Sequence, residues 1–241
     1  MIAPKTIVII PHYNHSKLIG GVISALKLYD LPILIMDDGS ALAERQRLAQ
    51  FADENVHIFY LSENRGKGGA VKEAFIEAKK LGYTHAIQVD ADGQHHLEDL
   101  PKFLACSQQY PESFICGKPI YDETAPKARL YGRKITDFWN MINTLSFDIK
   151  DGMCGFRLYP LKSCVDLIRH ESIGERMDFD TEILVKAHWY QIPMQWIETP
   201  VRYNPNGISH FRGLEDNWLI SKMHARLFLQ MCWRKLQGKS V

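Results

Sequence analysis

The chain has 241 residues, of which 46% are hydrophobic and 24% charged, and its formal net charge is +1. These values fit one soluble globular domain with a core of ordinary size, and the near-neutral charge gives no reason to expect a nucleic-acid partner. The five cysteines form no CxxC pair, which argues against a disulfide framework and favours reduced thiols in a cytosol. We expect neither a signal peptide nor a membrane-spanning segment.

The first half of the chain alternates short apolar, β-branched runs with segments whose apolar residues recur at helical spacing. We expect strands at 6–10, 33–36, 56–61 and 85–89. The intervening helices would begin after an N-cap at Ser16, cover 41–51, and end at Gly82. Repeated β-α units of this kind predict an α/β fold with a mainly parallel central sheet and helices on both faces.

The second half is less regular. We expect helices at 130–145, 179–188 and 214–236, and strands at 155–159 and 194–197, with Pro160 opening a further helix. Residues 201–212 are rich in Gly, Pro, Asn and Ser, which predicts a loop. We therefore assign 1–212 to the main domain and 213–241 to a C-terminal amphipathic helical extension of the same domain.

Polar, turn-forming clusters follow the four strands of the first half. They are PHYNH at 11–15, DDGS at 37–40, ENRGKGG at 63–69 and DADGQHH at 90–96. Each cluster alone could be an ordinary turn or loop, but four in strand order argue against coincidence. Because open α/β sheets bind ligands beyond the carboxyl ends of their strands, the clusters together predict a site for a polar ligand.

The DADGQ cluster carries the sharpest chemistry. Asp90 and Asp92 are two carboxylates at a strand end, and such hard oxygen ligands suit Mg²⁺ or Mn²⁺ bound together with substrate phosphates. A calcium loop is excluded because its sixth and twelfth positions would be His95 and Pro101. Lys67 lies among glycines at the start of a predicted helix, an arrangement that favours phosphate, although it matches neither a Walker A motif nor GxGxxG.

In order and spacing, these motifs resemble the inverting family 2 glycosyltransferases with the GT-A fold. The likeness is closest to the branch that makes polyprenyl- and dolichyl-phosphate mannose or glucose. The family's P-x-Y-N-E, D-D-G-S, N-x-G-K-G and D-A-D-x-Q-H correspond to 11–15, 37–40, 64–68 and 90–95, and two later segments correspond to 151–160 and 179–184. The resemblance implies a single GT-A (Rossmann-like) domain. It departs from the family at His15, which replaces a glutamate, and at Lys118, which replaces an arginine.

The resemblance also implies roles for individual residues. A nucleotide-diphosphate sugar would contact the four clusters, Lys118 and the GISHFR segment at 207–212, through Pro11, Tyr13, Asn14, Asp37, Asp38, Asn64, Lys67, Asp90, Ala91, Lys118, Ser209 and Arg212. Asp92, with Gln94, would bind Mg²⁺ or Mn²⁺. Arg157 would lie near the diphosphate and the acceptor, and Asp178 or Asp180 would be the general base.

The implied reaction moves a hexose from a UDP- or GDP-sugar to an acceptor, with inversion and with help from the metal ion. A hydroxyl acceptor needs a general base, whereas a phosphate acceptor ionises with a pKa of about 6 and needs none, so the sequence leaves both cases open. A sugar-1-phosphate nucleotidyltransferase and a non-catalytic nucleotide-sugar binding module are the alternatives. The first would usually carry a glycine-rich, basic loop after the first strand, which PHYNHSK does not supply.

The predicted final helix bears on the acceptor. It combines an apolar stripe and aromatic residues with four basic residues: Ile220, Met223, Leu227, Met231, Trp218, Phe228, Trp233, Lys222, Arg226, Arg234 and Lys235. Such a helix can lie in a membrane interface, which predicts a lipid-linked or amphipathic acceptor and a cytoplasmic protein attached peripherally to the membrane. The competing interpretation is a helix packed on the core or on a second subunit.

Overall fold

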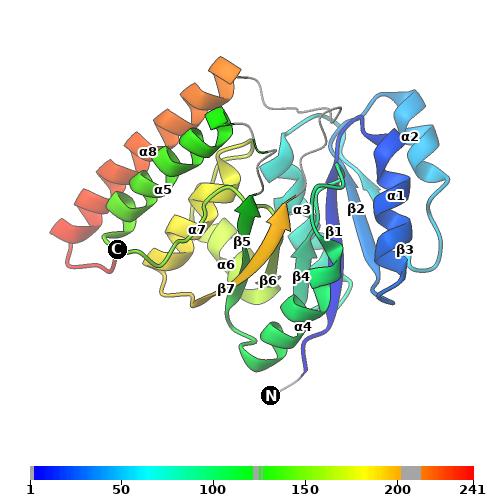
Figure 1. The fold of residues 1–241 in the computed structure, drawn as a ribbon, viewed down its shortest axis with the longest axis horizontal. Helices are drawn as coiled ribbons and strands as arrows, with labels where there is room; N and C mark the ends of the chain where they lie inside the picture. The colour runs from blue at the N-terminus through cyan, green and yellow to red at the C-terminus, as the bar shows by residue number, and fades with distance from the viewer. Residues whose placement is uncertain (1–2, 122–124, 126, 202–212) are drawn as a thin grey trace.

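The computed structural model describes residues 3–121, 125, 127–201 and 213–241. The strands of this part form one seven-stranded sheet in the order β3-β2-β1-β4-β6-β5-β7 (Figure 1). Only β6 runs antiparallel to its neighbours, so the predicted α/β fold with a mainly parallel sheet is confirmed. The strands are β1 Thr6–His12, β2 Ile33–Asp37, β3 Val56–Tyr60, β4 His85–Gln88, β5 Phe114–Tyr121, β6 Arg157–Pro160 and β7 Met194–Val201.

Helices cover both faces of the sheet. The core on one face includes side chains of α1, α2 and α4, and the core on the other face includes side chains of α3, α6, α7 and α8. The helices are α1 Ser16–Lys27, α2 Leu42–Ala49, α3 Lys67–Lys80, α4 Leu100–Gln109, α5 Lys127–Thr144, α6 Leu161–His170, α7 Phe179–Trp189 and α8 Gly213–Leu236.

A few local predictions differ from the structure. Ser16 is the first residue of α1 and not its N-cap, because its hydroxyl and backbone N–H donate to Glu44 of α2. Gly82 does follow the end of α3 with a φ of +83°, as expected of a glycine that closes a helix. The apolar pattern alone did not predict α4. The predicted loop at 201–212 lies outside the described residues apart from Val201, which ends β7.

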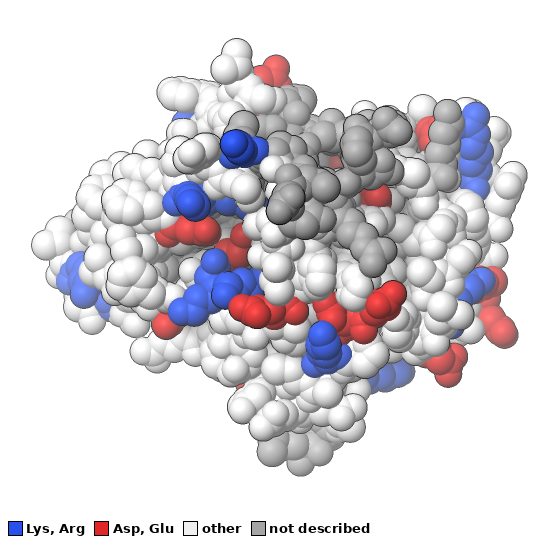
Figure 2. Space-filling view, viewed as in Figure 1, with Lys and Arg blue, Asp and Glu red and all other residues white. Residues whose placement is uncertain are grey.

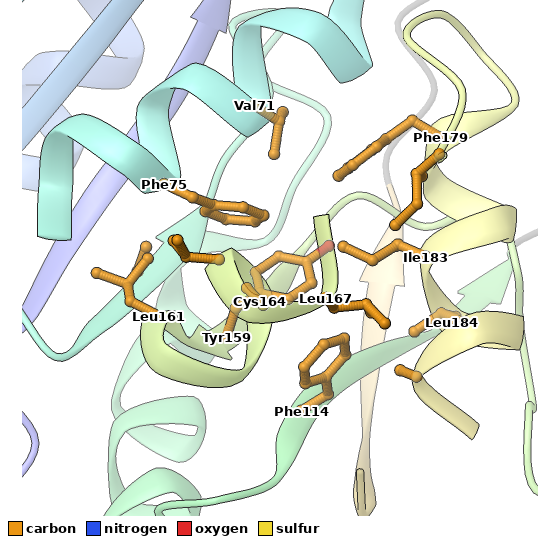
Figure 3. Close-up of a cluster of buried hydrophobic side chains, with 14 of the residues drawn as sticks. Val71, Phe75, Phe114, Tyr159, Leu161, Cys164, Leu167, Phe179, Ile183 and Leu184 are labelled. Carbon is orange, nitrogen blue, oxygen red and sulfur yellow. The ribbon is translucent and has the colours of Figure 1, made fainter. Parts of the chain in front are cut away.

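The larger core packs α3, α6 and α7 against the sheet (Figure 3). Phe75 and Phe114 each meet the ring of Tyr159 edge-on, at centroid distances of 4.9 and 5.1 Å. At the start of α3, a side chain on Gly68 would collide with Phe179, the first residue of α7. The absence of a side chain at Gly68 therefore lets the first turns of α3 and α7 lie in contact.

Helices α5 and α8 run side by side at the edge of the molecule (Figure 1). Met223, Leu227 and Met231 of α8 are buried in the same core as α3 and α7. The inner face of α8 is thus part of the core, as the competing interpretation held, while Trp218 and Trp233 remain exposed. The boundary between 212 and 213 stays a prediction, although α8 does begin at Gly213. No helix in the described ranges has the length and apolar character of a membrane span.

Candidate active site

The strand order places the candidate site at a switch point of the sheet. β1 is flanked by β2 on one side and by β4 on the other, so the chain after β1 and the chain after β4 diverge at their carboxyl ends. The crevice formed at such a point is where open α/β sheets bind ligands. Figure 2 shows acidic and basic side chains side by side across the middle of one face of the molecule.

Asp37 ends β2 and is fully buried. Its Oδ2 accepts a hydrogen bond from His12 Nδ1 at 3.0 Å, and its Oδ1 accepts from Arg45 Nε at 3.0 Å and from the Ser40 backbone N–H at 3.1 Å. Burial alone would raise the pKa of Asp37, but these hydrogen bonds, that from His12 first among them, outweigh it and lower the pKa. Both oxygens are engaged, so Asp37 organises the turn and would have to exchange a bond to contact a nucleotide.

The neighbouring turn after β1 is built around Asn14, whose φ is +54°. Asn14 donates its backbone N–H to Ser40 Oγ at 2.9 Å, and its side-chain oxygen accepts from the Ala41 N–H at 3.1 Å. Pro11 is half-buried within β1, whereas the Tyr13 side chain is 37% exposed. Tyr13 therefore presents a larger surface to a ligand than Pro11 or Asp37 does.

Asp38 fixes the loop that leads into α3. Its carboxylate accepts hydrogen bonds from the backbone N–H groups of Arg65 and Gly66, at 2.7 and 2.8 Å. Asn64 donates its side-chain amide to the Asp38 carbonyl at 3.1 Å. Burial raises the pKa of Asp38 to about 6 in spite of these two bonds. Asp38 and Asn64 thus position the start of α3, where Lys67 lies.

Lys67 connects the site to α7. Its Nζ donates to Asp90 Oδ2 at 3.0 Å and to Asp180 Oδ2 at 2.9 Å. Burial works against its charge, but Asp180 and Asp90 outweigh burial and raise the pKa of Lys67. Burial likewise opposes ionisation of Asp90, yet Lys67 lowers the pKa of that carboxyl well below its usual range. Asp90 and Asp180, which lie 23 and 113 positions from Lys67 in the chain, therefore form one charged cluster with it.

The DADGQ turn continues from this cluster. Ala91 is buried, Gly93 has a φ of +71°, and Asp92 Oδ1 accepts a hydrogen bond from the Gln94 backbone N–H at 3.0 Å. Within the described residues, no three His, Cys, Asp or Glu side chains are grouped so that they could hold a metal ion by themselves. Mg²⁺ is usually held by one or two carboxylates together with substrate phosphates, so Asp90 and Asp92 fit a metal that binds with the donor diphosphate.

Arg157 lies deeper than the sequence suggested. It is fully buried on β6, where its guanidinium donates to the backbone carbonyls of Asp180 and Gly152 at 2.5 and 3.0 Å. Thr181 Oγ1 donates to the same Gly152 carbonyl at 3.0 Å. Arg157 therefore fixes the 151–156 segment against the start of α7, and its expected place near the diphosphate and the acceptor stays a prediction.

The remaining predicted residues are more scattered. Asp178 is buried at the N-terminus of α7, where its Oδ1 accepts from the Arg176 N–H at 3.1 Å. Lys118 is exposed on β5 and pairs with Glu198 of β7 at 2.9 Å, two strands away from β4. Ser209 and Arg212 lie outside the described residues.

Sequence reasoning gave no role to His12, Arg45 and Gln88. His12 and Arg45 bind Asp37, and Gln88 donates to Asp90 Oδ1 at 3.3 Å. His95, whose only use in the sequence was to exclude a calcium loop, has a side chain that is 8% exposed and stacks on Phe156 with a centroid distance of 5.0 Å. In the sequence, the only sign that these residues belong to the site is that they lie beside or within the four polar clusters. Their roles depend on partners that come from other helices and strands.

Comparison with known protein families matches residues 7–166 to the family described as "Glycosyl transferase family 2". This match covers more than half of the chain. The chain belongs to glycosyl transferase family 2. The resemblance drawn from the motifs is therefore confirmed, and the alternative of a sugar-1-phosphate nucleotidyltransferase loses its support.

Two curated relatives illustrate the likeness. The chain is 27% identical over 210 residues to a dolichyl-phosphate beta-glucosyltransferase of Dictyostelium discoideum, covering 78% of this chain and 63% of the relative. It is also 27% identical over 232 residues to the polyprenol monophosphomannose synthase of Mycolicibacterium smegmatis, covering 87% of this chain and 82% of the relative. The chain thus spans less than two thirds of the Dictyostelium protein.

Solved structures support the fold. The glucosyl-3-phosphoglycerate synthase of Mycobacterium tuberculosis, solved with Mn²⁺, uridine diphosphate and phosphoglyceric acid, superposes with a TM-score of 0.69 at 13% identity, covering 95% of this chain and 78% of that one. The mannosyl-3-phosphoglycerate synthase of Rubrobacter xylanophilus gives a TM-score of 0.69 at 16% identity, covering 98% and 75%. At these identities the likeness shows the GT-A fold of the family and does not transfer a substrate.

Proposed function

We propose that this family 2 protein transfers a hexose from a UDP- or GDP-sugar to an acceptor, with inversion at the anomeric carbon. The observation that carries the proposal is the Lys67 cluster, which brings Asp90 of the donor side and Asp180 of α7 to one ammonium group at the switch point of the sheet. In a displacement reaction the leaving diphosphate and the attacking acceptor must be held on opposite sides of the sugar, and this cluster joins two such sides.

The donor diphosphate would lie over the DADGQ turn. Asp92 and Gln94, with Asp90 beside them, would hold Mg²⁺ or Mn²⁺, and the bound ion would neutralise charge that develops on the leaving diphosphate. The Mycobacterium tuberculosis structure was solved with Mn²⁺ and uridine diphosphate, which supports this choice. Tyr13 would contact the nucleotide base. Asp37 and Asn14 would stabilise the turn that carries Tyr13.

Asp180 is the better of the two candidate bases. Its Oδ1 is buried and has no hydrogen-bond partner among the described residues, whereas its Oδ2 is held by Lys67. Asp178 is buried to the same degree, but its Oδ1 already accepts the Arg176 N–H and its carboxylate lies against Gly174. The free oxygen of Asp180 would take the proton of a hydroxyl acceptor. With a phosphate acceptor it would remain a fixed negative charge, because that acceptor is already ionised.

We further propose a lipid-linked acceptor that is reached at a membrane surface, on the cytoplasmic side. Both curated relatives are named for polyprenol or dolichyl phosphate. Large apolar side chains of α5 and α8 are exposed. Most of the visible surface over these two helices is free of acidic and basic side chains (Figure 2). This outer apolar face comprises Tyr131, Ile135, Phe138, Leu214, Trp218, Leu229, Trp233 and Leu236. Basic residues near such a face add about 1 kcal/mol each on anionic lipid.

One screen tests the catalytic proposal. Purified protein would be given UDP- and GDP-sugars with Mn²⁺ or Mg²⁺ and a short polyprenyl phosphate, and release of UDP or GDP would be measured. We expect release that requires both metal and acceptor. Nucleotide binding without any release would favour the non-catalytic binding module, and binding of neither nucleotide would contradict the site itself.

Vesicle sedimentation tests the membrane proposal. Vesicles with anionic lipid should pull the protein down at low salt, and salt should weaken that binding. Replacing both Trp218 and Trp233 by serine should abolish sedimentation without changing nucleotide binding. If vesicles never bind the protein and size-exclusion chromatography shows a dimer that the double substitution dissociates, the outer apolar face contacts a second copy and not a membrane.

A further inference from the structure

The segment 171–178, between α6 and α7, contacts the start of α3 on one side. We call it the bridging loop. The Glu175 carbonyl accepts the Gly69 N–H at 2.9 Å, and the Glu175 carboxylate binds Arg65 at 2.7 Å and Lys72 at 3.1 Å. The hydrogen bond from Arg65, aided by Lys72, lowers the pKa of Glu175. The bridging loop is therefore bound to the helix whose first residue is Lys67.

On its other side the bridging loop is held by Glu182 of α7, whose side chain is 0% exposed. Glu182 Oε2 accepts the Gly174 backbone N–H at 2.9 Å and the Arg226 Nη2 of α8 at 2.6 Å. Lys186 lies 3.5 Å from Glu182 Oε1, and its own Nζ donates to Glu171 Oε2 at 2.8 Å. The start and the middle of the bridging loop thus meet one cluster of buried charges.

The charges of this cluster are balanced only when Arg226 is present. Glu171 and Glu182 carry two negative charges, and Lys186 and Arg226 carry two positive ones. Burial raises the pKa of Glu182, and Lys186 and Arg226 counteract that effect. Removing one partner of a buried pair leaves an uncompensated charge, which is far more harmful than removing an exposed pair. Arg226 itself is 45% exposed, so its loss would open no large cavity.

We infer that Arg226 is a positioning residue for the transfer reaction. Through Glu182 and the bridging loop, Arg226 fixes the positions of Lys67 and Asp180. Asp180 lies two residues before Glu182 on α7. Helix α8 is then part of the catalytic unit and not only an attachment surface. This inference rests on the proposed function for its kinetic consequence, but the structural link from Arg226 to Gly174 and Gly69 can be tested without it.

The kinetic test compares four variants of the full chain with the wild type. Arg226→Met should lower kcat by about tenfold to a hundredfold, the loss that a small displacement of reacting groups produces, and leave the donor KM within about threefold. Arg226→Lys should keep most of kcat. Adding Glu182→Gln to Arg226→Met should restore kcat to within about threefold, because glutamine still accepts the Gly174 N–H without the buried charge. Lys162→Met breaks an exposed ion pair with Asp166 and serves as the control that should change nothing.

A pH series adds a readout that a purely structural role would not move. Glu182 is faced by Lys186 of α7, Arg226 of α8 and Asp178, with Glu171 beyond Lys186. Without Arg226 the pKa of Glu182 rises further, so the penalty exists above that pKa and disappears as the pH falls through it. The ratio of Arg226→Met to wild-type kcat should therefore increase toward acid pH. A ratio that does not change with pH, or a double variant as impaired as Arg226→Met, overturns the inference.

Hydrogen exchange separates this inference from the proposed function. In Arg226→Met the amides of Gly174 and Gly69 should exchange at least about tenfold faster than in the wild type, while amides of β1 and β4 should not change. The double variant should restore both. Unchanged exchange at Gly174 and Gly69 overturns the inference even if the enzyme is active. Faster exchange in Arg226→Met, found together with a wild type that transfers no sugar from any donor, would support the structural link and contradict only the proposed function.

Discussion

Replacing Lys67 by methionine removes the ammonium group that holds Asp90 and Asp180 together. Both carboxylates lie about 3 Å from that nitrogen, so they are no more than about 6 Å apart. At an effective dielectric constant of about 20, two charges at this separation repel each other by roughly 3 kcal/mol. In the variant this repulsion is no longer balanced, which corresponds to a rise of about 2 units in the pKa of Asp90.

The pH dependence gives the sign of the effect. In the wild type Lys67 lowers the pKa of Asp90, so its contribution to stability is present above the unfolded pKa and is lost only in strong acid. In Lys67→Met a rise of about 2 units brings the folded pKa of Asp90 from about 2 back to about its unfolded value, so ionisation of Asp90 no longer stabilises the fold. The variant should therefore lose roughly 2 to 3 kcal/mol at about pH 7.5, and the difference from wild type should shrink as the pH falls from about 4 toward about 2.

Urea denaturation followed by circular dichroism measures this difference at several pH values. Lys67→Met combined with Asp180→Asn is the matched variant, because it removes the repulsion and should recover most of the lost stability while remaining inactive if Asp180 is the base. The reasoning is refuted if the single variant loses less than about 0.5 kcal/mol at neutral pH, or if its loss grows as the pH falls.

Three further predictions concern the metal, the donor and α8. Asp92→Asn should lower metal-dependent turnover by about a hundredfold with an unchanged circular dichroism spectrum, and near-normal turnover would contradict the metal assignment. Tyr13→Ala should raise the dissociation constant of UDP or GDP by about tenfold in calorimetry, because it removes the aromatic surface proposed to contact the base, and an unchanged dissociation constant would contradict that contact. Deleting 213–241 should give insoluble or unfolded protein on expression, since loss of buried Met223, Leu227 and Met231 removes roughly 5 kcal/mol; a soluble deletion product that binds nucleotide would refute this.

Local patterns in the sequence were enough to predict the fold class and the edge of the sheet at which the site lies. Strands such as β1 and β2 contain buried apolar runs, and helices such as α3 carry an apolar stripe closed by Gly82, so short-range periodicity was enough to find them. The rule that ligands bind beyond the carboxyl ends of parallel strands then located the four polar clusters. Helix α4 was missed because no polar motif drew attention to its short pattern.

Contacts between distant segments decided how each polar residue is used. Asp37 appeared available for a ligand, but His12, Arg45 and Ser40 occupy its oxygens. Arg157 was expected near the diphosphate, and only the structure shows that it is fully buried on β6, where it donates to two backbone carbonyls. No periodicity in the chain encodes such partners, because each pairing depends on the order in which the strands and helices pack.

The same reason explains the two features that connect the site to the rest of the molecule. The sequence predicts a phosphate contact for Lys67 among its glycines and shows Arg226 only as one basic residue of a long helix, so it names the carboxylate partner of neither. Only the packed structure brings Lys67 to Asp180 and Arg226 to the buried Glu182. A buried carboxylate must be compensated by whichever cation the fold brings within reach, and that choice is made by tertiary geometry and not by position along the chain.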